Sequence, residues 1–93
     1  MTQCDIILDA MLSNPQKEWW YAKDFQGGKY FVGYEATARM TDVLNLYPDM
    51  FRYAKDGRFR VLAINWNNEN EIDYQIERLE AIKEILRKEE ENE

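Results

Sequence analysis

The chain has 93 residues, a mass of 11.2 kDa and a formal net charge of −6, which is the size of one small domain with a modest core. Aromatic residues make up 14% of it, more than a disordered chain carries. A single Cys and no His exclude an intramolecular disulfide, the familiar Cys/His zinc sites and every imidazole-dependent triad. We therefore expect no enzymatic activity, metal or other cofactor. The start lacks a basic region and no apolar run approaches the roughly 18 residues of a membrane span, so we expect a cytoplasmic protein without membrane contact.

The negative charge is confined to the C-terminal third. Residues 1–64 contain eight basic and eight acidic residues, whereas residues 65–93 contain four basic and ten acidic ones. Within the neutral part, residues 52–60 hold four cations and a single carboxylate. We therefore expect a neutral body with one basic spot and an acidic tail.

The first predicted element is a helix that begins near Thr2 and ends at Asn14. Its apolar residues recur at i, i+3, i+4, i+7 and i+8: Cys4, Ile7, Leu8, Met11 and Leu12. Thr2 and Asp5 have the spacing of a capping box, and Asn14 precedes a proline that ends the helix. Because Cys4 lies on the apolar stripe, its position favours a small buried side chain over a reactive thiol.

Short elements are predicted next, followed by a second helix. A brief strand is expected at residues 19–21 and one helical turn at residues 21–25, before Gly27 and Gly28 interrupt the chain. From Tyr34 to Tyr47 the apolar residues converge on one side at helical period, which predicts a helix that ends before Pro48.

The clearest local signal is a β-hairpin over residues 50–64. Asp56-Gly57 lies between two β-rich runs and favours a two-residue type I′ turn. This turn predicts three cross-strand pairs: Lys55 with Arg58, Tyr53 with Arg60, and Phe51 with Leu62. The hairpin would then have an apolar base and a cationic tip whose repulsion an anionic partner would relieve. The alternative is that the charged tip serves only solubility.

A polar connector, residues 65–71, leads to a long predicted helix over residues 72–90. Its apolar stripe is roughly 120° wide and consists of Ile72, Ile76, Leu79, Ile82 and Leu86. Burying one Leu or Ile contributes roughly 1.5–3 kcal/mol, so the stripe is expected to be covered. It can fold back on the first helix, beside Ile6 and Ala10, or pair with a second copy. We favour a homodimer because the last helix is longer than the first helix can cover, and a strict heptad fails at Lys83, which predicts a short, irregular helix pair.

A family resemblance follows from this order of elements. The run Ala-Arg-Met-Thr-Asp-Val-Leu at residues 38–44, then Tyr-Pro-Asp at 47–49 and the hairpin, resembles the helix-then-wing segment of small winged helix-turn-helix proteins of bacteria, archaea and their phages. The resemblance covers about residues 4–64. It implies an α+β winged helix domain over residues 1–66, with residues 67–93 as a C-terminal amphipathic helix for dimerisation.

In that family the helix before the wing commonly enters the DNA major groove, and the wing touches the backbone or the minor groove. Carried onto this chain, the resemblance implies DNA contacts from nine residues: Tyr34, Thr37, Ala38, Arg39, Thr41, Arg52, Lys55, Arg58 and Arg60. It implies a homodimeric transcription regulator that binds double-stranded DNA. One alternative is a winged helix module that binds another protein, because Glu35 and Asp42 outnumber Arg39 on the helix. Arg39 would then serve only an ion pair with one of those carboxylates.

Overall fold

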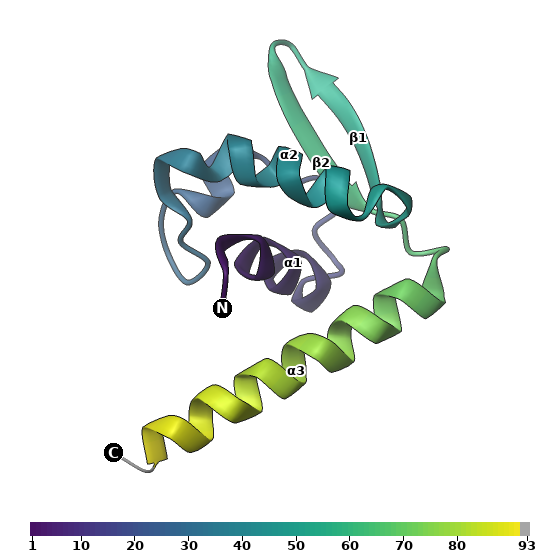
Figure 1. Cartoon of the computed structure of the whole chain (residues 1–93). Coiled ribbons are helices and arrows are strands. Elements are labelled where there is room, and N and C mark those ends of the chain that lie inside the picture. The colour runs from purple at the N-terminus through teal and green to yellow at the C-terminus, as the bar shows by residue number, and fades with distance from the viewer. Residues whose placement is uncertain (92–93) are drawn as a thin grey trace.

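The computed structural model describes residues 1–91, over which three α-helices and one two-stranded antiparallel hairpin follow one another (Figure 1). The helices and strands are α1 (Gln3–Ser13), α2 (Ala36–Leu46), β1 (Phe51–Asp56), β2 (Phe59–Ile64) and α3 (Glu69–Glu91). Three short 3₁₀ helices connect them: η1 (Ala22–Phe25), η2 (Gly33–Glu35) and η3 (Pro48–Met50). The predicted α+β class, with a helical part and a hairpin, is confirmed.

α1 is the centre of the core. Its start is fixed by the predicted capping box, in which Thr2 Oγ1 accepts from the Asp5 amide at 3.1 Å and the Thr2 amide donates to the Asp5 carboxylate at 3.4 Å. Figure 1 shows α2 on one side of α1 and α3 on the other. The fully buried side chains at their junctions include Ile7, Leu8, Met11, Phe25, Met40, Val43, Met50 and Leu62. Cys4 packs against this cluster, as its place on the stripe predicted, and burial raises the pKa of its thiol.

The hairpin register differs from the predicted one by two residues. Lys55 lies opposite Arg60, and the pairs Tyr53 with Leu62 and Phe51 with Ile64 follow. Gly57 has a φ of +62°, and the next residue has no positive φ, so Gly57 and Arg58 are the central pair. A positive φ at the first central residue alone belongs to a type II′ turn. Asp56 thus remains in β1, where its carboxylate accepts a hydrogen bond from Tyr21 at 2.7 Å. Because side chains alternate with period two, the shift leaves the predicted faces unchanged.

The brief strand predicted at residues 19–21 is reduced to a single bridging residue. Trp20 exchanges two backbone hydrogen bonds with Leu62, at 2.8 and 3.1 Å, along the edge of β2 that β1 leaves open. The ring of Trp20 stacks on Phe25 with centroids 5.4 Å apart. This bridge fixes η1, the predicted helical turn, beside the hairpin.

α3 begins three residues earlier than predicted, at Glu69, and its two halves have different surroundings. In the first half Ile72 and Leu79 are buried in the core, with 4% and 2% of their surface exposed. The expectation that the whole stripe pairs with a second copy is therefore wrong for these two residues, because the core of the same chain already buries them. Ile76 and Ile82 are half-buried, and Leu86 is exposed.

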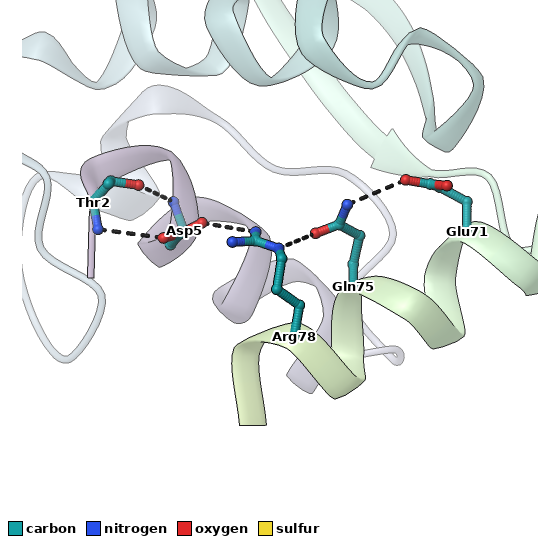
Figure 2. Close-up of polar contacts among 5 residues, drawn as sticks. All are labelled: Thr2, Asp5, Glu71, Gln75 and Arg78. Atoms are coloured by element: carbon teal, nitrogen blue, oxygen red, sulfur yellow. Dashed lines mark hydrogen bonds and ion pairs between the residues drawn. The ribbon is translucent and has the colours of Figure 1, made fainter. Parts of the chain in front are cut away.

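A polar network joins the first half of α3 to the start of α1 (Figure 2). Arg78 donates to Asp5 at 2.8 Å and, through Nε, to the side chain of Gln75 at 2.7 Å, while Gln75 donates to Glu71 at 3.1 Å. Burial alone would raise the pKa of Asp5, but the hydrogen bonds and charge of Arg78, together with Thr2, outweigh it and hold that pKa below its usual value. The network thus orients α3 on α1 and satisfies the buried amide of Gln75.

Candidate nucleic-acid interface

Half of the basic side chains are already ion-paired. Six of the twelve lie within 4 Å of a carboxylate: Lys17, Arg39, Arg52, Arg78, Lys83 and Arg87. Of the other six, which have no such partner among residues 1–91, four surround the end of the hairpin, and we call them the hairpin cations: Lys23, Lys55, Arg58 and Arg60. Cations without a carboxylate are the groups that can exchange their counterions for phosphates.

A groove of about 550 Å³ lies between η1, α2 and the hairpin. Three of the hairpin cations line it, Lys23 from η1 and Arg58 and Arg60 from the hairpin. Apolar lining comes from Met40 of α2 and Phe59 of β2. The groove therefore combines positive charge with an aromatic surface, a combination typical of nucleic-acid contacts.

The arginines beside the groove are held by local contacts. Arg60 donates through Nη1 to Thr41 Oγ1 of α2 at 3.3 Å, and its guanidinium lies 5.8 Å from the ring centre of Tyr53. Arg58 lies 5.7 Å from the ring centre of Phe59. Cation–π contacts of this kind restrain a guanidinium without neutralising it. Both charges therefore stay available while their side chains lose part of their freedom before any ligand binds.

The hydrogen bond between Tyr21 and Asp56 ties the hairpin end to the segment before η1. Its acceptance by the carboxylate raises the pKa of the Tyr21 hydroxyl. Asp56, the one carboxylate of residues 1–91 that lines the groove, is thus already engaged with a neutral donor and makes no ion pair with the neighbouring cations. The sequence analysis did not predict Tyr21 or Lys23 as site residues. Both lie beside the hairpin because the bridge between Trp20 and Leu62 places the following segment there.

The predicted contacts on α2 form a nearly neutral surface. Tyr34 is fully exposed in η2, and Thr37 and Ala38 are exposed in the first turn of α2. Arg39 lies with its Nε 3.1 Å from a carboxylate oxygen of Asp42. The ion pair expected as the alternative role of Arg39 is present, with Asp42 rather than Glu35 as the partner. The Nε makes no aligned hydrogen bond there, so this is a charge contact only.

Arg52 is the one predicted hairpin contact that stands apart from the hairpin cations. Its guanidinium is 3.2 Å from Glu18 and lies over the ring of Trp19 at 5.2 Å. Arg52 is three residues before Lys55 in β1, and side chains alternate between the two faces of a strand. Arg52 therefore lies on the opposite face of the hairpin from Lys55 and from Arg60, the cross-strand partner of Lys55. The structure therefore brings together Lys55, Arg58 and Arg60 of the predicted set and separates Arg52 from them.

The acidic charge lies on the far side of the molecule. α3 contains nine acidic and four basic residues, and Figure 1 shows α2 and α1 between the hairpin and α3. The molecule is 48 Å long in its greatest dimension, whereas the Debye length is about 8 Å at physiological ionic strength. The carboxylates toward the C-terminal end of α3, which Figure 1 shows farthest from the hairpin, are therefore largely screened at the hairpin end.

Over residues 1–91 no three potential metal ligands converge, and no helix has the length and apolar character to cross a membrane. No family model, curated protein or solved structure matches this chain.

Proposed function

We propose that the protein is a winged helix DNA-binding protein, a small transcription regulator whose hairpin is the wing. The observation that carries this proposal is that the hairpin cations gather at the end of the hairpin with no carboxylate partner among residues 1–91, whereas six of the other eight cations are paired. A duplex presents one phosphate charge per about 1.7 Å of its axis, and such a polyanion relieves the repulsion between Lys55 and Arg60.

The arrangement of elements supports the same fold. α1, the bridging Trp20, η1, α2 and the hairpin follow in the order of a winged helix domain, with Trp20 in the place of the first strand of its small sheet. α2 then corresponds to the helix that faces the major groove. Its exposed surface would offer Tyr34, Thr37 and Ala38 to base edges.

The charge distribution sets the expected mode of binding. Arg58 and Arg60 are suited to phosphate oxygens because a guanidinium donates two parallel hydrogen bonds. The surface of α2 is nearly neutral because Asp42 pairs with Arg39, so it adds little electrostatic attraction for the phosphates. We therefore expect affinity to come chiefly from the wing and to depend strongly on salt, with a modest sequence preference.

The test is a salt titration of binding to a fluorescent mixed-sequence duplex, followed by anisotropy between about 50 and 200 mM salt. Each phosphate neutralised contributes roughly 0.9 to the slope of log K against log salt, so the double variant Arg58→Ala/Arg60→Ala should lower the slope by up to about 1.8. The matched control is Arg87→Ala/Lys88→Ala on α3, which removes the same charge far from the wing and should leave the slope unchanged.

A protein-binding winged helix module is the second candidate. The neutralised Arg39 and the exposed apolar side chains of Tyr34 and Leu46 on and beside α2 favour it. Absence of duplex binding at the lowest salt, or an equal slope for both double variants, would contradict the DNA proposal and leave this module as the better explanation.

A further inference from the structure

The groove between η1, α2 and the hairpin has an excess of positive charge. Three cations line it, Lys23, Arg58 and Arg60, and Asp56 is the one carboxylate of residues 1–91 among its lining residues. Asp56 accepts the hydrogen bond from Tyr21 at 2.7 Å and makes no ion pair with these cations. Three positive charges and one negative charge give the lining a formal charge of +2. The groove is therefore suited to a doubly charged anion.

The size and the apolar part of the lining favour an organic anion over an inorganic one. The volume of about 550 Å³ falls within the roughly 300–1,000 Å³ of pockets that hold small organic molecules. Met40, which is 2% exposed, provides buried apolar surface, whereas Phe59 is 60% exposed and presents its ring. Aromatic side chains stack on planar rings such as nucleobases. A ligand that fills the groove therefore combines a planar ring with its negative charge.

The two arginines are restrained by contacts that leave hydrogen-bond donors free. A guanidinium has five N–H groups, and the hydrogen bond from Arg60 to Thr41 at 3.3 Å uses one of them. Arg58 lies 5.7 Å from the ring centre of Phe59, a contact that uses the charge of the guanidinium and no carboxylate. Restrained side chains lose less conformational entropy when a ligand binds. The arginines are therefore prepared to hold an anion at little entropic cost.

We propose that the groove binds a nucleoside monophosphate or another planar ring that carries a phosphomonoester. A phosphomonoester has a charge of about −1.5 to −2 at neutral pH, which matches the lining, whereas each phosphodiester of a nucleic-acid strand has a single charge. The ring stacks on Phe59. Gln26 and Thr37, which also line the groove, offer neutral hydrogen-bonding groups to the edge of the ring.

The consequence of this site for DNA binding rests on the proposed function. Arg58 and Arg60 line the groove and are also the side chains expected to contact the phosphates of a duplex. One N–H group cannot donate fully to two phosphates, so a bound nucleotide should compete with the duplex. Binding of the nucleotide itself needs no DNA and is measured without it.

Titration of the isotope-labelled protein with adenosine monophosphate, up to about 1 mM and without DNA, tests the site. We expect the backbone amides of Ala22, Thr37 and Phe59 to show the largest shifts in the NMR spectrum. The ribose phosphate without the base lacks the stacking ring and should bind at least roughly fivefold more weakly. Adenosine lacks the phosphate and should bind at least roughly tenfold more weakly.

Two variants locate the ligand in the groove. Ala22→Trp fills part of the groove and keeps every cation, so it should abolish the binding of adenosine monophosphate. Ala81→Trp makes the same change at an exposed position of α3 and is the control that should bind normally. Phe59→Ala removes an exposed ring and does not depend on how the larger side chain packs. It should weaken the binding of adenosine monophosphate at least roughly fivefold and leave the binding of the ribose phosphate nearly unchanged.

Three outcomes would overturn the proposed site: no shifts with adenosine monophosphate, equal affinities for this ligand and the ribose phosphate, or normal binding by both variants. The competition is tested by the duplex titration at matched ionic strength, in which saturating adenosine monophosphate should weaken duplex binding at least roughly fivefold. Unchanged duplex affinity with the nucleotide bound would overturn the competition. A protein that binds no duplex would instead contradict the proposed function, and the NMR titration would still decide whether the groove holds the nucleotide.

Discussion

The hairpin segment, residues 51–64, and α3 each carry four cations, and their partners differ. On α3 three of the four are ion-paired, with Asp5, Asp9 and Glu84, whereas in the hairpin segment only Arg52 pairs with a carboxylate of residues 1–91. The acidic helix thus uses two of its cations to hold itself to α1 and a third within the helix. The positively charged hairpin segment leaves three of its four cations exposed to solvent without a carboxylate partner among residues 1–91.

This difference separates cations that hold two helices together from cations that make no such contact. Arg78 donates hydrogen bonds to Asp5 and Gln75 at the junction of α1 and α3. Its removal would therefore leave the carboxylate of Asp5 without this partner. Arg58 and Arg60 have aromatic neighbours and pair with no carboxylate of residues 1–91, so their removal leaves no acidic group of that stretch unpaired. Equal numbers of cations in the two regions therefore predict opposite results when an arginine is removed from each.

The largest effect is expected where α3 is part of the core. Leu79→Ala removes a side chain that is 2% exposed and should lower the free energy of unfolding by about 2–5 kcal/mol, much of what a domain of this size has. Leu86→Ala, in the same stripe but 38% exposed, should cost less than about 1 kcal/mol. Urea denaturation at low protein concentration measures both without a contribution from self-association. Equal losses would contradict the division of α3 into a docked and a projecting half.

A smaller effect is expected for the arginines. Arg78→Ala should cost about 1–3 kcal/mol because it leaves the carboxylate of Asp5 without its charged donor, whereas Arg58→Ala should stay within about 0.5 kcal/mol. The same denaturation curves distinguish these values. A destabilised Arg58→Ala variant would show that the hairpin cations contribute to the stability of the fold.

The Asp5–Arg78 pair also adds a pH dependence to this comparison. The pKa of Asp5 is lowered in the folded state, so its contribution is complete above the unfolded value, near pH 4, and is lost as pH falls through the folded value. Arg78→Ala removes the main interactions that lower this pKa. Its stability should therefore fall less steeply below about pH 4 than that of the wild type.

The smallest effect concerns the turn that presents Arg58. Gly57 has a φ of +62° and open space around the position of a Cβ, so Gly57→Ala should cost about 1 kcal/mol through backbone strain alone. Gly27 has the same open space without a positive φ, and Gly27→Ala should be neutral or slightly stabilising. Thermal unfolding of the two variants measures the difference. Equal midpoints would argue against the type II′ turn.

The elements were largely predictable because their signals are local. Helical periodicity, the Thr2–Asp5 spacing and the prolines after α1 and α2 are properties of neighbouring residues. The hairpin was also local, but its register was not. Asp-Gly is compatible with more than one turn placement, and the contact that keeps Asp56 in β1 comes from Tyr21, 35 positions earlier.

The candidate site was predictable in part, for the same reason. The hairpin arginines are adjacent in sequence and were identified by their charge. The pairing of Arg52 with Glu18 and the arrival of Lys23 at the groove both need the chain to return to β2 at Trp20. The division of α3 into a buried first half and an exposed second half depends likewise on where α1 ends. The apolar periodicity of α3 alone does not indicate that position.

The bridge between Trp20 and Leu62 also bears on how the domain folds and opens. A hairpin with a two-residue turn forms in about 1–10 μs, but these two hydrogen bonds join residues on either side of η1 and α2 and form only after that loop closes. Their amides lie in the core, so they should exchange with deuterium only when the whole domain unfolds. The amides at the end of the hairpin should exchange by local opening, so that the end of the hairpin can move while its base stays fixed.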